Sequence, residues 1–525
     1  MTGGAALARQ LRAEGVEVVF GLPGDQLMSA LDAFVDEPEL RYIVTRHEQA
    51  TTYMADGYAR AAGRPGVAMV VPGVGVYNAA TGLATAYACS SPVLLLAGQV
   101  NRDGIGRDLG LLHDVHDQLD VVRPITKWAT RALTAAEIAP AVREAFARMT
   151  TGRPRPVHVE VPPEAFAESA PVGILAPTPT VPVAPDEAAL DKAAQVLAGA
   201  AAPLVVAGGG VVLGGASAAL VALAERLQAP VVTTREGKGA IDDRHPLSVG
   251  TMWVNRRLRA VIDAADVVLA VGTRFQGFGL GPHQRLVHVD VDADQIGRNH
   301  PVDVAVAGDA GLALGALAAL IPGGRASRVD EARAHRAATE AALRAIGPAA
   351  GMVEALRAGI PEDGIVVCDT TTVAYMCHMH YPVYLPRTYL STSYMGTLGF
   401  GFPAALGAKV GRGDRPVVTV VGDGGFLFAS NELATAVQHG IHTVTVVFDD
   451  GAYGNSNRDQ REKFGGRELG TVLRNPDWVQ LARAFGAEGV VVSDVGALTG
   501  AVREACATEA STVIAVPMDR LPSPF

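Results

Sequence analysis

The stretch that decides the fold is PVVTVVGDGGFLFASNELATAVQHGIHTVTVVFDDGAYGN, residues 416–455. Two almost continuous apolar runs, 417–421 and 444–448, lie on either side of a segment with helical periodicity. Such runs are typical of parallel strands that are covered on both faces. We therefore predict a βαβ unit with a helix that is capped by Ser430 or Asn431 and ends at Gly440.

Each of the two apolar runs is followed by aspartate and glycine. The crossover returns the second strand beside the first, so Asp423 and Asp450 should meet at neighbouring carboxyl ends, where open α/β sheets bind ligands. Paired carboxylates suit Mg²⁺, and the amide groups of Gly424 and Gly425 favour an anion. The stretch therefore predicts a magnesium-diphosphate site, which a nucleotide could also use. Two plain Asp-Gly turns are the alternative interpretation.

The alternation of strands and helices continues along the whole chain. Its 525 residues exceed a single core and, at about 150 residues per domain, suggest three domains. We predict an α/β fold of three doubly wound parallel-sheet domains, residues 1–168, 185–325 and 345–525. The segment 167–185, rich in proline and alanine, is interpreted as a linker. The first and third domains resemble each other in pattern, and the middle one differs.

Composition limits the partners and the compartment. The chain has 44 basic and 54 acidic residues, and its net charge of −10 argues against nucleic acid as a partner. No apolar run is long enough to span a bilayer, and we see no signal peptide, so we expect no membrane partner. The four cysteines form no CxxC motif, which fits a reduced, cytoplasmic location.

Seven motifs together resemble a known family. They are RHEQATTYMADGYARAAGRPGV (46–67), LLLAGQV (94–100), TKWA (126–129), GRPRPVHVEVP (152–162), REGKGAIDDRHPLSVG (235–250), GTLGFGFPAALGA (396–408) and the GDGG…DDGAYGN pair of the opening stretch. Over nearly its whole length the chain resembles the thiamine-diphosphate-dependent enzymes of the acetolactate synthase and 2-oxo-acid decarboxylase superfamily. The resemblance implies a first domain that binds the aminopyrimidine of the cofactor and a third that binds its diphosphate.

The resemblance also implies roles for particular residues. Glu48 would hydrogen-bond the aminopyrimidine ring and favour the tautomer that removes the thiazolium proton. Leu398 would hold the cofactor bent, and the Gly396 carbonyl would accept from the pyrimidine amine. The metal ligands would be Asp423, Asp450 and the Ala452 carbonyl. Further cofactor contacts are expected from Pro72, Asn78, Thr371, Thr372, Gly424, Gly425, Tyr453, Gly454 and Asn455.

One expected metal ligand departs from the family pattern, because the family usually has asparagine where this chain has Asp450. An added carboxylate about 5 Å from a phosphate charge costs on the order of 3 kcal/mol at an effective dielectric constant of about 20. Direct ligation of a divalent cation should offset that cost, since hard cations prefer charged oxygen donors. We therefore expect the site to work, and the substitution leaves the metal affinity and its pH dependence open.

Fewer residues bear on the substrate. Asp25 in PGD and His113 in LLHD resemble the active-site acid and histidines of pyruvate-decarboxylase-like enzymes and could transfer protons. An ordinary surface loop without a role in proton transfer is an equally good interpretation of HDVHDQ (113–118). Gln99 in LLLAGQV looks more like the acetolactate synthases, which often hold FAD in the middle domain. Arg274 lies in a similar element, but VGTMW (Val249–Trp253) departs from the family pattern, so FAD is only a candidate cofactor.

The resemblance implies an enzyme that binds thiamine diphosphate through Mg²⁺ and decarboxylates a small-molecule 2-oxo acid. Carboligation of the acetolactate synthase type is our first hypothesis, because SNRDQREKFGG (456–466) lacks the acidic residue that decarboxylases carry after the metal motif. A non-oxidative 2-oxo-acid decarboxylase is the alternative, and a cofactor-binding homologue without activity is the non-enzymatic one. A homodimer or homotetramer with active sites at the subunit interface is expected.

Overall fold

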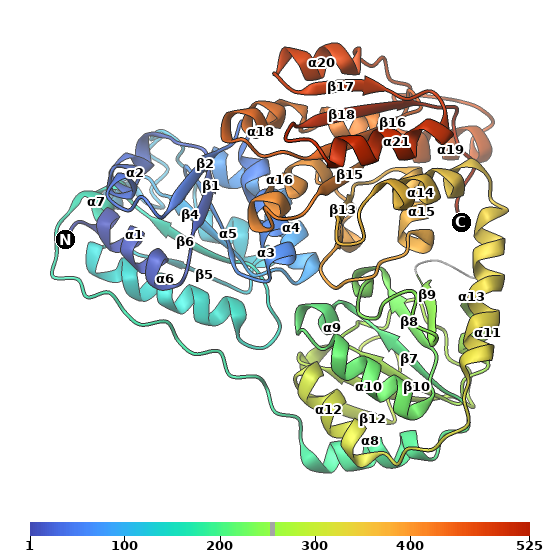
Figure 1. The fold of residues 1–525 in the computed structure, drawn as a ribbon. Helices are drawn as coiled ribbons and strands as arrows, with labels where there is room; N and C mark the ends of the chain where they lie inside the picture. Colours follow the sequence, from blue (N-terminus) through green and yellow to red (C-terminus); the bar gives the residue numbers. More distant parts are fainter. Residues whose placement is uncertain (253–257) are drawn as a thin grey trace.

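The computed structural model describes residues 1–252 and 258–525, and Trp253 of the VGTMW element lies outside them. The described chain contains three six-stranded sheets, and every strand pairing within them is parallel. Helices cover both faces of each sheet, and the three units form three lobes (Figure 1). The predicted α/β class with three doubly wound sheets is therefore confirmed.

The first sheet has the strand order β2-β1-β3-β4-β6-β5. Its strands are β1 (Val18–Gly21), β2 (Arg41–Val44), β3 (Gly66–Val70), β4 (Val93–Gly98), β5 (Trp128–Arg131) and β6 (Val157–Val161). Its main helices are α1 (Gly3–Ala13), α2 (Met28–Val35), α3 (Glu48–Ala62), α4 (Val74–Cys89) and α6 (Ala135–Thr150). The strand order reverses between β1 and β3, which makes the loops after these two strands the expected ligand position.

The third sheet has the equivalent order, β14-β13-β15-β16-β18-β17. Its strands are β13 (Ile365–Cys368), β14 (Tyr389–Ser391), β15 (Val417–Gly422), β16 (Val444–Asp449), β17 (Glu488–Val491) and β18 (Thr512–Pro517). Helices α14 (Pro348–Gly359), α15 (Thr372–His380), α16 (Gly401–Gly411), α19 (Gly454–Lys463), α20 (Trp478–Ala484) and α21 (Val495–Cys506) cover it. Its switch point lies between β13 and β15, at Asp369 and Asp423.

Residues 416–455 form the predicted βαβ unit. Strands β15 and β16 are parallel neighbours and almost fully buried, with Val418 opposite Val444. The crossover consists of α17 (Asp423–Leu427), a 3-10 turn (Ser430–Glu432) and α18 (Leu433–His439), and Gly440 ends it in the left-handed conformation. The predicted cap was wrong: α18 starts later, and neither Ser430 nor Asn431 caps it, because both residues lie within the 3-10 turn.

The central sheet differs from the other two. Its order is β12-β11-β10-β7-β8-β9, and it consists of β7 (Pro203–Ala207), β8 (Val231–Thr234), β9 (Ser248–Met252), β10 (Val267–Val271), β11 (Arg285–Asp290) and β12 (Val304–Ala307). Three strands lie on each side of the switch between β7 and β10, which is the order of dinucleotide-binding folds. The flanking helices include α8 (Glu187–Ala198), α9 (Gly209–Leu213), α10 (Ser217–Leu227), α11 (Arg259–Asp263) and α12 (Ala310–Leu320).

The first and third units pack directly on each other through α3 and α16. A Cβ on Gly57 would lie 1.9 Å from the Ala404 carbonyl oxygen, and one on Gly407 would lie 1.9 Å from the Met54 carbonyl oxygen. The two glycines therefore let the helix backbones touch. An extended segment, 169–186, leads to the central unit, and α13 (Val329–Arg344) runs along the opposite edge back to the third unit (Figure 1).

Candidate active site

The expected carboxylate of the first unit is buried where α3 begins. Glu48 is the first residue of α3 and only 7% exposed. The Asn78 side-chain amide, in the second turn of α4, donates to Glu48 Oε2 over 2.9 Å. This bond fixes the carboxyl group and leaves Oε1 outside the pair. Glu48 is therefore a buried, hydrogen-bonded carboxyl group, and its expected role toward the aminopyrimidine stays a prediction.

The turn between β3 and α4 lies beside this pair and is held by a buried network. Gln118 accepts from the Gly73 amide at 2.8 Å and donates to Glu160 at 2.8 Å. Glu160 also accepts from Gln99 at 3.1 Å and from Arg131. Gln99 therefore lies behind the Pro72–Gly75 turn, where its amide supports the network. The sequence singled out Gln99 but gave no reason to select Gln118 or Glu160.

Asp25 and His113 approach the same turn from two loops. A Cβ on Gly24 would lie 2.2 Å from the Val71 side chain, and one on Gly73 would lie 2.3 Å from the His113 carbonyl oxygen. Asp25 is exposed, and His113 is half-buried with a φ of 67°, in the left-handed region. The structure thus brings both residues to the switch point of the first sheet, where both side chains are at least partly accessible to solvent.

The third unit places two carboxylates at the ends of β15 and β16. Asp423 is buried, and its Oδ2 accepts from the Ala452 amide at 3.1 Å and from the Asn475 side-chain amide at 2.6 Å. The backbone bonds from Tyr453 to Thr471 and from Leu473 to Gly451 flank Ala452 and leave its carbonyl outside the pairing. Two carboxylates and one carbonyl are oxygen donors of the kind Mg²⁺ prefers.

Electrostatics at this position favour a bound cation. Burial, and then the charge of Asp423, raise the pKa of Asp450 to about 6. Burial also raises the pKa of Asp423. Two carboxylates that destabilise each other's charge fit a divalent cation between them, together with the diphosphate. Among residues 1–252 and 258–525, no group of three or more His, Cys, Asp or Glu side chains is arranged to hold a metal ion, so diphosphate and water oxygens would complete this shell.

Two glycines make room for this arrangement. A Cβ on Gly454 would lie 2.5 Å from the Asp450 Oδ2 atom, and one on Gly424 would lie 2.5 Å from the Tyr453 ring. Gly425 lies against Asp369, with a Cβ-to-Oδ1 distance of 3.3 Å if a side chain were added. These contacts explain Gly424 and Gly425 of GDGG and the glycine of AYG. Asn455 is exposed and bonded to Arg458.

Asp449 and Asn475, which no motif singled out, support the carboxylate of Asp423. Asp449 accepts from the Trp478 indole at 2.6 Å, from Asn475 at 2.7 Å and from the Gly451 amide at 3.1 Å. Asn475 therefore bridges Asp449 and Asp423. Groups that orient metal ligands are expected around such a site, but the separation between residues 423 and 475 left no local sequence signal.

The segment 396–399 lies beside the end of β13. Gly396 and Gly399 have φ values of 63° and 77°, and Leu398 between them is half-buried. The Thr397 hydroxyl lies 3.1 Å from the Thr85 hydroxyl of α4, which links the segment to the first unit. Thr371 packs beside Gly422, and Thr372 is the buried first residue of α15. The residues expected around the diphosphate are thus brought together.

Glu432 was not selected either, and it connects the two units. It is fully buried, and its two carboxylate oxygens accept from the Arg46 amide at 3.0 and 3.1 Å. Its Oε2 also accepts from the Thr435 hydroxyl at 2.6 Å. Burial raises the pKa of Glu432 to about 7, against the opposing effect of these donors and of the Arg46 charge.

The raised pKa of Glu432 predicts a pH-dependent stability. The folded protein holds this proton up to about pH 7, whereas the unfolded chain releases it near pH 4.5. The contribution to the free energy of unfolding is therefore present below pH 4.5 and lost as the pH rises to about 7, roughly 3 kcal/mol in all. Glu432→Gln cannot release this proton. We therefore expect the free energy of unfolding of the wild type minus that of Glu432→Gln, measured by urea unfolding, to fall as the pH rises from 5 to 8. A difference that does not change with pH would contradict the assignment.

A cavity of about 1170 Å³ lies where the three units meet. It opens at the switch point of the central sheet, where Gly208 and Gly210 contact Gly272. Its lining includes Cys89, Gly209, Arg274, Asp290, Thr370 and Gly396. The cavity therefore extends from the central unit to the segment expected to hold the cofactor.

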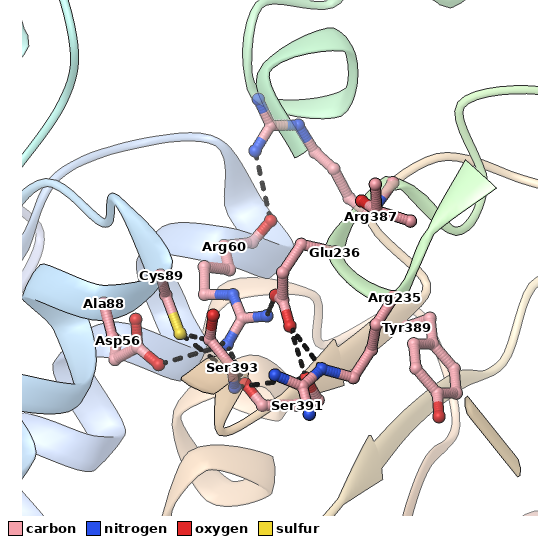
Figure 2. A network of polar contacts seen from close by, with 12 residues as sticks. Asp56, Arg60, Ala88, Cys89, Arg235, Glu236, Arg387, Tyr389, Ser391 and Ser393 are labelled. Atoms are coloured by element: carbon pink, nitrogen blue, oxygen red, sulfur yellow. Dashed lines mark hydrogen bonds and ion pairs between the residues drawn. The ribbon is translucent and has the colours of Figure 1, made fainter. Parts of the chain in front are cut away.

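One wall of this cavity contains a buried ionic network (Figure 2). Arg60 of α3 donates to the Ser391 carbonyl at 2.7 Å and pairs with Glu236 of the central unit at 2.9 Å. Asp56, one helical turn earlier, lies 3.4 Å from Arg60. The Ser391 hydroxyl donates to Glu236 at 2.6 Å. Arg60 thus joins all three units.

Comparison with known proteins gives matches to each of the three units. The family model described as thiamine pyrophosphate enzyme, N-terminal TPP binding domain, matches residues 1–122. The central domain model of the same enzymes matches residues 190–317, and the C-terminal TPP binding domain model matches residues 369–516. The first and last matches contain Glu48 and Asp423, respectively.

Curated relatives extend over nearly the whole chain. A probable 2-ketoarginine decarboxylase of Pseudomonas aeruginosa is 37% identical over 505 residues, covering 93% of this chain and 88% of the relative. A probable acetolactate synthase large subunit of Methanocaldococcus jannaschii is 34% identical, covering 93% and 86%. The acetolactate synthase large subunit of Haemophilus influenzae is 30% identical, covering 96% and 92%. In the described part of the chain, no helix is both long and apolar enough to cross a membrane.

Proposed function

We propose that this chain, which belongs to the family of thiamine pyrophosphate enzymes, decarboxylates a 2-oxo acid and ligates the remaining fragment to a second carbonyl, as acetolactate synthases do. The observation that carries the proposal is the pair of prepared half-sites: the buried Glu48–Asn78 pair in the first unit and the Asp423–Asp450 pair in the third. Thiamine diphosphate, when bound, supplies the electron sink for loss of CO₂.

The chain's own residues bind, orient and move protons. Asp423, Asp450 and the Ala452 carbonyl would hold Mg²⁺, and Glu48 would bond the aminopyrimidine. Asp25 and His113, at the open switch point of the first sheet, are the proposed groups for proton transfer to and from the substrate. We propose the domain division 1–168 for pyrimidine binding, 185–325 for the central domain and 345–525 for diphosphate binding.

Product analysis tests the function. The protein is incubated with Mg²⁺, thiamine diphosphate and pyruvate or longer 2-oxo acids, and the products are identified by mass spectrometry. We expect CO₂ and a 2-hydroxy-ketone or acetohydroxy-acid product that contains two substrate fragments. Release of the aldehyde alone would contradict carboligation, and absence of CO₂ with every 2-oxo acid would contradict the enzymatic role.

Decarboxylation of a 2-oxo acid with a cationic side chain is the second candidate. The Pseudomonas relative is a probable 2-ketoarginine decarboxylase. Within the described residues, both carboxylate oxygens of Asp114 are buried without a hydrogen-bond partner, next to His113. An unpaired carboxylate suits a guanidinium group. A strong preference for 2-keto-arginine over pyruvate that is lost in Asp114→Asn would favour this candidate.

The metal site gives a prediction for Asp450. Replacing it with asparagine keeps an oxygen ligand and removes one of two repelling carboxylates, so we expect the Mg²⁺ concentration for half-maximal activity to change less than about threefold. Asp450→Ala removes the ligand and should raise that concentration more than about tenfold. Asp459→Ala, on the exposed face of α19, is the control. Equal Mg²⁺ dependence of the Ala and wild-type proteins would exclude Asp450 as a ligand.

We also propose a homodimer, or a homotetramer built from it, in which the two half-sites of different subunits meet. Exposed apolar side chains lie beside both half-sites: Val74 and Tyr77 are 44% and 54% exposed near Asn78, and Leu427 and Phe428 are 40% and 52% exposed after GDGG. A second copy would cover them. Light scattering should give at least twice the monomer mass, and a monomer active at assay concentration would contradict the assembly.

FAD is the proposed occupant of the central cavity. The strand order, the close Gly208–Gly272 contact and Arg274 at the cavity wall fit a dinucleotide. We expect the purified protein to carry visible flavin absorbance, or to acquire it on incubation with FAD, and Arg274→Ala to weaken it. A protein that remains colourless after incubation would contradict the prediction.

A further inference from the structure

We propose that Glu432 is a positioning residue for Glu48: a buried carboxylate of the diphosphate-binding unit fixes the backbone from which the carboxylate of the pyrimidine-binding unit projects. This inference rests on the proposed function of Glu48. Glu432 ends the 3-10 turn before α18 and is fully buried. Both its oxygens accept from the amide of Arg46, two residues before Glu48.

The same helix holds the end of β2 at two further points. His439 Nε2 accepts from the Val44 amide at 3.1 Å, and the Thr435 hydroxyl lies 3.3 Å from the Val44 carbonyl oxygen. The Gln438 side chain accepts from the guanidinium of Arg46 at 2.5 Å. Helix α18 therefore fixes the backbone from β2 to the start of α3. Among these backbone contacts, the bond from the Arg46 amide to Glu432 is the nearest to Glu48 in the sequence.

The contact of Glu432 with the Arg46 amide, called the clamp below, is made by the segment that also contains Asp423 of GDGG. The crossover runs from Asp423 through α17 to Glu432 and α18, with no intervening strand. One continuous segment therefore contributes a proposed metal ligand and contacts the residues before Glu48. The segment thus joins, within one chain, a diphosphate half-site and a pyrimidine half-site, which the proposed dimer assigns to two different active sites.

A buried carboxyl group is a costly way to hold a backbone amide, because desolvation of the polar group opposes it. The raised pKa of Glu432 reflects that cost. An apolar contact would pack the interface as well without fixing an amide in direction. Directional bonds matter for a group that must lie within about 0.5 Å of its productive position. The geometry therefore fits a positioning role better than a packing role.

The experiment compares Glu432→Ala and Glu432→Gln with Gln438→Ala, which loosens Arg46 from the same helix but leaves its amide bonded. The first readout is hydrogen–deuterium exchange of the C2 proton of bound thiamine diphosphate, measured by NMR. We expect Glu432→Ala to slow it at least about tenfold, since a displacement of about 1 Å can cost about a hundredfold. Glu432→Gln keeps one acceptor oxygen, so its C2 exchange rate should lie between those of the wild type and Glu432→Ala. Gln438→Ala should stay within about twofold.

Two further measurements separate positioning from folding. Affinity for Mg²⁺ and thiamine diphosphate, measured by titration, should change less than about threefold in Glu432→Ala, because the diphosphate ligands are intact. Amide exchange of the peptide covering residues 44–49 in the apoprotein should increase in Glu432→Ala and not in Gln438→Ala. The proposal is overturned if Glu432→Ala exchanges the C2 proton at the wild-type rate and keeps wild-type amide protection, whatever its melting temperature. If Glu432→Ala does not fold, Glu432→Gln decides by the same readouts.

Failure of the proposed function would look different. A wild-type protein that binds no thiamine diphosphate would overturn that function, and amide exchange in the apoprotein would still decide whether Glu432 clamps the start of α3. A wild-type protein that binds the cofactor and exchanges its C2 proton, alongside Glu432 variants that do so equally fast, would overturn the clamp alone.

Discussion

Replacing Glu48 with glutamine is expected to lower turnover by a factor of about 100 or more while the protein still binds thiamine diphosphate and Mg²⁺, as loss of an acid–base group typically does. Glutamine has the same length and can still accept from Asn78, whose amide now bonds Glu48 at 2.9 Å. It cannot supply a carboxyl group to the aminopyrimidine. The loss should therefore appear in kcat, measured at saturating cofactor by CO₂ release from the best 2-oxo acid.

Binding provides the internal control for this variant. The proposed diphosphate and metal contacts lie in the third unit, so cofactor affinity should fall by no more than about tenfold, the lower end of the effect of one hydrogen bond to a charged group. Glu17→Gln is the matched variant, because Glu17 is an exposed carboxylate of the same domain that pairs with Arg64. It should retain wild-type activity. Turnover above about half of wild type in Glu48→Gln would refute its assigned role.

The local parts of the fold could be predicted from the sequence. The strand at 417–422 and the helix end at Gly440 follow from continuous apolar runs and from a glycine that adopts positive φ. The meeting of Asp423 and Asp450 follows from the handedness of a single crossover. The start of α18 could not be predicted, because a tertiary contact decides it: the 3-10 turn 430–432 carries Glu432 to the amide of Arg46.

The candidate site shows the same division. Residues inside motifs, such as Glu48 and Asp450, could be selected because their types and neighbours carry the chemistry. Asn475 and Glu432 could not, since each acts through a partner dozens to hundreds of positions away. Gln99 could be selected, but its position behind the Pro72–Gly75 turn depends on Glu160 in another strand. Periodicity and motif spacing contain no information about such pairs.

Arg60→Met is expected to cause the largest loss of stability. The guanidinium of Arg60 is the charged partner of Asp56, which is fully buried, and of Glu236 in the central unit. Burial already raises the pKa of Asp56, while Arg60 opposes that shift. Removing the cation leaves buried negative charge without compensation, which typically costs about 3–5 kcal/mol. Thermal unfolding and urea unfolding of the apoprotein should both show the loss.

A second variant separates charge from packing at this position. Arg60→Met combined with Asp56→Asn removes the fully buried carboxylate along with the cation, so part of the lost stability should return. Arg64→Ala is the control: Arg64 pairs with Glu17 in solvent, and its loss should cost less than about 1 kcal/mol. If Arg60→Met is no less stable than Arg64→Ala, the network of Figure 2 does not hold the three units together. If it is less stable and Asp56→Asn recovers nothing, the lost contacts with Ser391 and Glu236 carry the effect instead.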